Sequence, residues 1–280
     1  MLEVPGGLIE LITTGSGLPA TVFAHGLTGS IETTRPFGSG VGGSRTFMHF
    51  QGYGASRAAQ APDIRPTYAA LAGELRAVAD QVGATQALGV SMGAGALCAL
   101  VARTPLRFER LVFVMPAVLD RPRPDEALDR LVAMAHDVDH RDVGALTALL
   151  LAGEPSSVRN QPAVQLWCSR QAVALVGAQV SRALRAMPAA VALKDRGVLA
   201  AVTVPVLVIA QEDDPVHPVW VAEALAAILP DARLEVMAPG GLLWHHRPRL
   251  RELIGGFLSV QPAQRLARAS HTSGGSGAED

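Results

Sequence analysis

The chain has 280 residues, 49% of them hydrophobic, with 24 Lys or Arg against 25 Asp or Glu. This length suits one large domain, with or without an inserted lid, better than two independent domains. The apolar residues come in short runs broken by Gly, Pro or charge, which predicts a soluble globular protein without a membrane span. A net charge of −1 provides no basic field, so we expect neither nucleic acid nor a membrane surface as a partner.

The first six residues, 1–6, show neither the basic nor the apolar stretch of a secretion signal, which predicts a cytoplasmic protein. Cys98 and Cys168 are the only cysteines, and two thiols in that compartment are most often free and buried. No His, Cys, Asp and Glu cluster has zinc-ligand spacing, so we expect no metal. Residues 38–43 match the Gly-x-Gly-x-x-Gly dinucleotide pattern but lack a strand before and a helix after, so we expect no cofactor.

In chain order, short runs of Val, Leu and Ile alternate with segments of helical periodicity. This alternation predicts an α/β fold, with a mostly parallel central sheet and helices on both faces. The first two strands are separated by Gly15-Ser16-Gly17, which predicts a hairpin. The expected strands are 7–14, 20–24, 45–50, 86–90, 110–115, 204–209 and 233–237. The expected helices that cover the sheet are 67–82, 93–102, 219–229 and 249–258.

The segment from Asp120 to Gly197 has helical periodicity interrupted by several prolines. It predicts a helical cap, residues 120–197, inserted into an α/β core formed by residues 1–119 and 198–260. Residues 261–280 are polar and small, which predicts a disordered tail.

The motif that carries chemistry is Gly89-Val90-Ser91-Met92-Gly93. A serine hydroxyl is a poor nucleophile unless it is exposed, partnered with a base and faced by hydrogen-bond donors. A sharp turn between a strand and a helix exposes the hydroxyl, and glycines two positions on either side leave room for that turn. The predicted strand before Ser91 and the predicted helix after it supply this setting.

With this motif in place, the chain resembles the α/β-hydrolase family over roughly residues 7–260. The segment Phe23-Ala24-His25-Gly26-Leu27 resembles the family's His-Gly segment, and residues 51–56 resemble its turn after the next strand. The resemblance implies Ser91 as the nucleophile and the backbone N–H groups of Leu27 and Met92 as the oxyanion hole. It also implies His25 as a structural residue of the oxyanion segment. We expect His25, Gly26 and, from the cap, Trp167 to border the substrate pocket.

The strand 204–209 and the loop after it resemble the family's segment that carries the triad acid. The family spacing falls on Asp214, with Gln211 at the position of the family's glycine. Asp213 is the neighbour most easily confused with Asp214. Asp120, just after the preceding strand, lies where some family members place the acid instead.

The histidine is where the chain departs from the family. The family usually shows Pro-Gly-x-Gly-His after the last strand, whereas this chain has Pro239-Gly240-Gly241-Leu242-Leu243. Just beyond, His245 and His246 are the candidate general bases, with His246 favoured. A base must come within about 2.6–3.2 Å of the hydroxyl, so this choice requires an altered loop. His217, in the acid loop, is a more distant candidate.

These residues predict a serine-nucleophile hydrolase that cleaves an ester, thioester or C–C diketone bond of a small hydrophobic substrate. If no histidine is positioned on Ser91, the same pocket would support a lyase, cyclase or condensation reaction instead. The third alternative is a non-catalytic ligand-binding protein of the same fold. The sequence leaves the oligomeric state open.

Overall fold

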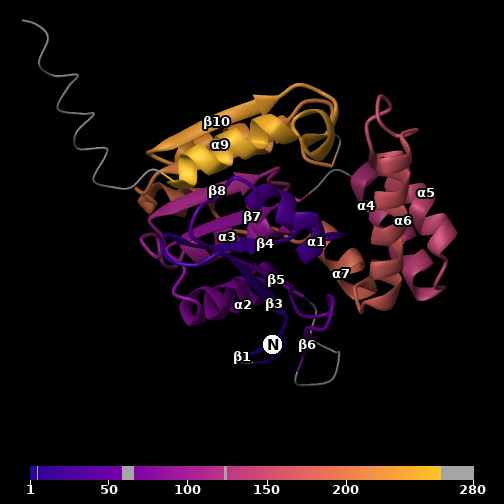
Figure 1. Cartoon of the computed structure of the whole chain (residues 1–280), viewed down its shortest axis with the longest axis horizontal. Coiled ribbons are helices and arrows are strands. Elements are labelled where there is room, and N and C mark those ends of the chain that lie inside the picture. Colours follow the sequence, from indigo (N-terminus) through magenta and orange to yellow (C-terminus); the bar gives the residue numbers. More distant parts are fainter. Residues whose placement is uncertain (5, 59–65, 123–124, 215, 260–280) are drawn as a thin grey trace, which may run out of the picture.

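The computed structural model describes residues 1–4, 6–58, 66–122, 125–214 and 216–259. Its centre is a seven-stranded sheet of order β10-β9-β8-β7-β4-β5-β3 (Figure 1). The strands from β4 to β10 in this sheet pair in parallel, whereas β3 (Leu11–Thr14) runs antiparallel at one edge. The parallel strands are β4 (Ala20–Ala24), β5 (Ser44–Met48), β7 (Gln86–Val90), β8 (Arg110–Val114), β9 (Val206–Gln211) and β10 (Ala232–Met237). The predicted fold class is confirmed.

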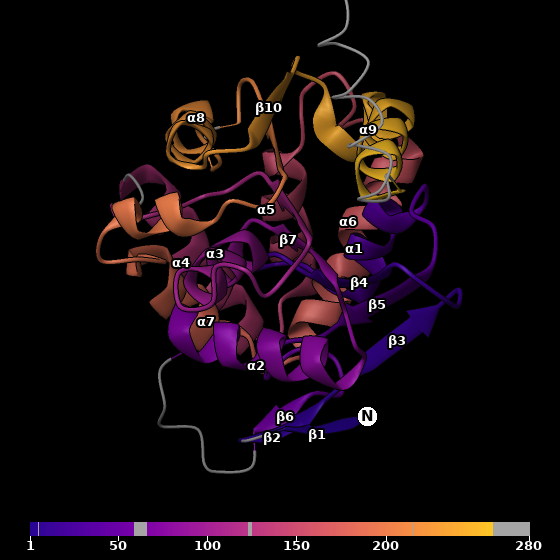
Figure 2. The same ribbon diagram turned by 90° about the vertical axis from the view of Figure 1, so that its left-hand side faces the viewer.

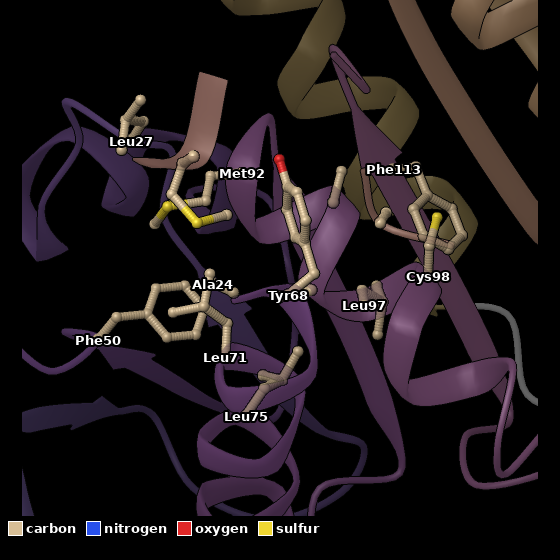
Figure 3. Packing of buried hydrophobic residues seen from close by; sticks show 14 of the residues in the cluster. Ala24, Leu27, Phe50, Tyr68, Leu71, Leu75, Met92, Leu97, Cys98 and Phe113 are labelled. Atoms are coloured by element: carbon tan, nitrogen blue, oxygen red, sulfur yellow. The ribbon is translucent and has the colours of Figure 1, made fainter. Parts of the chain in front are cut away.

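Helices cover both faces of the sheet, and alternate strand residues enter two separate cores. In β8, Leu111 and Phe113 belong to one core, whereas Val112 and Val114 belong to the other. Figure 2 shows the two groups of helices on opposite faces, and Figure 3 shows the core beneath α2 and α3. One face carries α2 (Tyr68–Gln81), α3 (Met92–Val101) and α8 (Val219–Ile228), and the other α1 (Ile31–Thr34), η1 (Arg35–Gly38) and α9 (Arg247–Ser259). Because both faces are covered, the strands read as continuous apolar runs.

The predicted hairpin between residues 7–14 and 20–24 is wrong. The first segment divides at Glu10 into β2 (Gly7–Ile9) and β3, and β3 pairs antiparallel with β5, with Leu11 opposite Met48. At this break between the two strands, Glu10 Oε2 accepts hydrogen bonds from His49 Nδ1 at 2.9 Å and the Ala55 N–H at 2.6 Å. β2 instead joins a small sheet with β1 (Leu2–Val4) and β6 (Arg57–Ala58). The other predicted strands and sheet-covering helices end within two residues of the observed ones.

Between β8 and β9 the chain forms a separate group of helices, which we call the cap (residues 125–189). It contains α4 (Asp125–Asp139), α5 (Val143–Gly153), α6 (Pro162–Gly177), α7 (Ser181–Ala186) and the turn η2 (Met187–Ala189). Figure 1 shows α4 to α7 beside the sheet, apart from the helices that cover its faces. The next turn, η3 (Arg196–Ala201), crosses the predicted boundary at 197. The predicted tail, residues 261–280, lies outside the described residues.

Two further observations concern the described chain. Cys98 and Cys168 are both free and buried, as predicted. Within the described ranges, no helix combines the length and the apolar character needed to cross a bilayer.

Glu74 on α2 provides a test of the packing around β5. Its Oε2 accepts the Gln51 N–H at 2.9 Å, but burial raises the pKa of Glu74 to about 7, despite that hydrogen bond. A carboxyl whose pKa is higher in the folded state stabilises the fold most below its unfolded pKa of about 4.5. That contribution is lost as the pH rises through about 7.

We therefore expect Glu74→Gln to favour stability more at pH 8 than at pH 4.5. The change that it causes in the free energy of unfolding should be about 1–3 kcal/mol more positive at the higher pH. Urea unfolding at both pH values measures this difference, and the exposed Glu223→Gln controls for the loss of one charge. An equal effect of Glu74→Gln at both pH values would contradict the expectation.

Candidate active site

Ser91 lies at the sharp turn between β7 and α3, at the carboxyl end of a central strand. Its φ of 51° is in the left-handed region that residues with a side chain rarely adopt. The turn is held because the Ser91 N–H donates to the Val114 carbonyl of β8 at 2.9 Å and the Ser91 carbonyl accepts the Gly95 N–H at 3.1 Å. A Cβ at Gly93 would overlap the carbonyl of Ala24, so the motif needs glycine there. The strand, turn and helix expected around Ser91 are present.

A histidine side chain contacts the Ser91 hydroxyl, and it is His217. His217 Nε2 lies 2.8 Å from Ser91 Oγ, and His217 Nδ1 lies 2.9 Å from Asp214 Oδ2. A carboxylate only accepts hydrogen bonds, so Nδ1 carries the proton and Nε2 presents its lone pair to the serine O–H. Ser91, His217 and Asp214 thus form a continuous hydrogen-bonded chain.

Asp214 and His217 come from one loop, between β9 and α8. Asp214 Oδ1 accepts the backbone N–H groups of Val216 at 2.9 Å and His217 at 3.1 Å, a side-chain-to-backbone turn typical of aspartate. This turn directs Oδ2 toward the His217 ring. Burial raises the pKa of Asp214, but the charge and hydrogen bond of His217 and the two backbone donors outweigh it, so this pKa lies below its ordinary value. Asp214 is therefore ionised at neutral pH.

This geometry corrects the expectation that His245 or His246 would partner Ser91. After β10 the chain forms a short π-helical turn, η4 (Gly241–His245), in which His245 is the last residue and which His246 directly follows. His246 Nε2 donates to the Ala238 carbonyl of its own loop at 2.7 Å, and His245 is exposed at the rim of the cavity described below. Leu243 stands where the family has its histidine, and the loop brings neither His245 nor His246 to Ser91. The sequence signal for His217 is the Asp-x-x-His spacing, because a turn closed by the Asp214 side chain brings Asp214 and His217, three positions apart, into contact.

The other two candidate acids lie elsewhere. Asp213, with a φ of 56°, is exposed next to Asp214. Asp120 Oδ2 accepts from Arg196 Nε at 2.8 Å, and the pair is a salt bridge. Asp214 is the candidate that contacts the histidine.

His25 fixes the loop that follows β4. It is fully buried, and burial lowers its pKa to about 3, so the ring is neutral. His25 Nε2 accepts the Phe50 N–H at 3.1 Å, and Nδ1–H donates to the Gly26 carbonyl at 2.7 Å. The expectation that His25 borders the substrate pocket is therefore corrected, because its ring lies beneath the loop, away from the cavity.

The peptide N–H groups of Leu27 and Met92 are the expected oxyanion donors. A trans peptide directs its C=O and N–H in opposite directions, so the bond from His25 to the Gly26 carbonyl orients the Leu27 N–H away from His25. Gly26 lies directly against Ser91, since a Cβ on Gly26 would be 3.4 Å from the Ser91 Cβ. Met92 begins α3, where the first N–H groups have no partner within the helix.

Two further hydrogen bonds anchor the loop after β4, which carries the Leu27 N–H. Tyr53 Oη donates to the Leu27 carbonyl at 2.7 Å. Gln171, on cap helix α6, donates through Nε2 to the Thr28 carbonyl, also at 2.7 Å. The cap therefore directly holds the loop that carries the Leu27 N–H.

A cavity of about 860 Å³ opens over Ser91 and His217, between the strand ends and the cap. Gly26 and Trp167 line it, as expected from the sequence. Trp167 packs edge-on against Trp244, with ring centroids 5.8 Å apart. The loop after β10, which lacks the family's histidine, thus forms a wall of the cavity.

Comparison with known proteins agrees with the fold. A family model described as alpha/beta hydrolase fold matches residues 19–243, and the chain belongs to this family. The predicted resemblance is confirmed, and membership of the family supports a hydrolase type of activity. No curated protein sequence matches the chain.

Solved structures share the fold at low sequence identity. An esterase from Exiguobacterium antarcticum is 22% identical, with a TM-score of 0.72, over 92% of this chain and 97% of that one. A carboxylesterase from Bacillus subtilis is 20% identical, with a TM-score of 0.72, over 92% and 90% of the two chains. The enol-lactonase from Burkholderia xenovorans LB400 is 20% identical, with a TM-score of 0.72, over 92% and 98%. At these identities the likeness concerns the fold.

Proposed function

We propose that the protein hydrolyses carboxylic esters or lactones through Ser91 as nucleophile. His217 accepts the proton of the serine hydroxyl as Oγ attacks the carbonyl carbon, and Asp214 stabilises the resulting imidazolium. The peptide N–H groups of Leu27 and Met92 stabilise the negative oxygen of the tetrahedral intermediate. His217 then protonates the departing alcohol, and a water molecule releases the acid from Ser91 by the same steps in reverse.

One observation carries the proposal: the hydrogen-bonded chain from Asp214 through His217 to Ser91. The lyase, cyclase or condensation alternative depended on the lack of a base on the serine, and the contact of His217 with Ser91 removes that ground for it. The non-catalytic alternative would give no reason for Asp214, His217 and Ser91 to form a hydrogen-bonded chain. Because solved structures of similar fold include esterases and a lactonase, we favour oxygen esters and lactones over diketones as the substrates of this protein.

Labelling with a fluorophosphonate probe tests the proposal, because the probe reacts with an activated serine. We expect stoichiometric modification of Ser91 at pH 7.5, none in Ser91→Ala, and hydrolysis of short p-nitrophenyl esters by the wild type. Ser30, which caps α1, provides the matched control, since Ser30→Ala should label fully. A wild-type protein that neither labels nor cleaves these esters would contradict the proposal.

The cap anchor at Gln171 leads to a second prediction. Gln171→Leu removes the bond to the Thr28 carbonyl, and we expect kcat for ester hydrolysis to fall about 3- to 10-fold, the worth of one hydrogen bond. KM should change less, because the oxyanion donors act mainly in the transition state. Gln165→Leu, at an exposed position of the same helix, is the control. A loss confined to KM would argue against a role for Gln171 in positioning the loop.

A further inference from the structure

Two arginines of the cap face the cavity that contains Ser91. Arg130 comes from α4, and Arg159 comes from the segment between α5 and α6. We call them the cap arginine pair. Ser156 and Ser157, which precede Arg159, line the same part of the cavity. Both guanidinium groups are partly buried, so the cavity has a cationic region opposite the sheet.

Backbone carbonyls fix the positions of the pair. Arg130 Nη2 donates to the Leu149 carbonyl at 2.6 Å. Arg159 Nη2 donates to the carbonyls of Ala152 at 3.1 Å and Glu154 at 2.8 Å. These carbonyls belong to the carboxyl end of α5 or follow it, where a helix attracts cations. The helix end therefore orients both side chains before any ligand binds.

Among the side chains that the structure describes, no contacting acid matches the positive charge of the pair. Within the described part of the chain, no carboxylate lies within 4.0 Å of either guanidinium. Burial lowers the pKa of Arg130, although the charges of Asp214 and Glu154 act in the opposite direction. Partial removal of this guanidinium from water therefore costs free energy.

The acids of the cavity already have other partners or lie in solvent. Glu154 Oε2 accepts Trp244 Nε1–H at 2.7 Å, and Asp214 is bonded to His217. Glu212 and Asp213 are exposed. A guanidinium offers five N–H donors, and neutral carbonyls occupy few of those on the pair. The remaining donors suit an anionic group of a bound molecule.

We propose that the cap arginine pair binds a free carboxylate of the substrate, so that the preferred substrates are esters or lactones that also carry a carboxylate. This inference rests on the proposed function, because it concerns the same cavity. A carboxylate, with one negative charge, fits better than a phosphate dianion, because Glu154 and Asp214 place negative charge nearby. Apolar walls formed by Leu131, Trp167 and Trp244 accommodate the carbon chain between the carboxylate and the scissile carbonyl.

Matched ester pairs test the preference. Monoethyl succinate, glutarate and adipate are compared with ethyl butanoate, pentanoate and hexanoate at pH 7.5, with released ethanol as the measured product. At the chain length that spans the cavity, we expect kcat/KM to be about 10- to 100-fold higher for the monoester of the diacid, the usual worth of a charged hydrogen bond. Equal kcat/KM values within every pair would overturn the inference.

Variants of Arg130 assign the preference to the pair. Arg130→Met should remove the advantage of the diacid monoester, so that its kcat/KM comes within about 3-fold of that of the matched neutral ester. Arg130→Lys keeps the positive charge and should retain part of the advantage. This second variant keeps the test valid if the cap of Arg130→Met does not fold. A parallel fall for both esters in Arg130→Met, with the advantage unchanged, would overturn the assignment.

Binding of the free diacids separates this inference from the proposed hydrolysis. We expect succinate, glutarate or adipate to bind Ser91→Ala in calorimetry, and to bind about 10- to 100-fold more weakly when Arg130→Met is added. If this difference is seen without any ester hydrolysis, the anion site stands and the hydrolase proposal fails. If esters are cleaved but no diacid binds and no carboxylate preference exists, the hydrolase proposal stands and the anion site fails.

Discussion

Replacing His217 with alanine is expected to lower kcat for a short ester by at least about 10³-fold, because Ser91 loses the group that accepts its proton. Fluorophosphonate labelling of Ser91 should disappear in parallel. The expected effect is large because the members of such a triad act as a unit, so the loss of one removes most of the benefit of all. Stopped and continuous ester assays, with thermal unfolding to verify the fold, measure the outcome.

His246→Ala is the matched control, since His246 bonds to the Ala238 carbonyl and makes no contact with the serine among the described interactions. We expect it to retain activity close to that of the wild type. The reverse pattern, with His217→Ala active and His246→Ala inactive, would show that the loop after β10 supplies the base in solution.

Asp214→Asn should be the second most damaging substitution, with kcat reduced about 10³- to 10⁴-fold and little change in the fold. The asparagine Oδ1 can still accept the N–H groups of Val216 and His217. Its NH₂ group, however, takes the place of Oδ2 and donates to His217 Nδ1. The ring proton then moves to Nε2, which can no longer accept the proton of Ser91.

Asp213→Asn changes the neighbouring carboxylate in the same way and serves as the comparison, since Asp213 is exposed and asparagine tolerates its left-handed backbone. Hydrolysis of one ester by both variants, with circular dichroism, gives the contrast. Comparable losses in the two variants would mean that the charge of the loop, and not the orientation of His217, matters.

Much of the fold was predictable because buried parallel strands read as apolar runs and the covering helices as periodic ones. The seven predicted strand runs each correspond to strands of the structure. The pairing of β3 was not predictable from the turn at Gly15-Ser16-Gly17, because a turn signal is local. β3 pairs with β5 instead, and the Glu10 carboxylate just before β3 contacts His49 and Ala55, about 40 residues away in the chain.

The site was only partly predictable. Ser91 was found from its glycine spacing, and Asp214 from its place after β9, since both signals are short stretches of sequence. His217 was harder to predict, because the family's usual histidine follows the last strand, where this chain has His245 and His246. The deciding fact is the turn in which Asp214 Oδ1 binds two backbone N–H groups, since this turn directs the His217 ring toward Ser91. Three-dimensional contacts of the cap, such as Gln171 with Thr28, had no sequence signal.

The placement of Asp214 and His217 on one short loop has a consequence for how the enzyme can change. In the family's usual arrangement, the segment after the last strand must hold a catalytic histidine, which restricts its sequence. Here residues 239–245 line the cavity, and under the proposed function the proton transfer falls to His217 instead. Random substitution of that segment should therefore alter which molecules are accepted while the rate of the chemical step is preserved, so recognition and reactivity can be evolved independently.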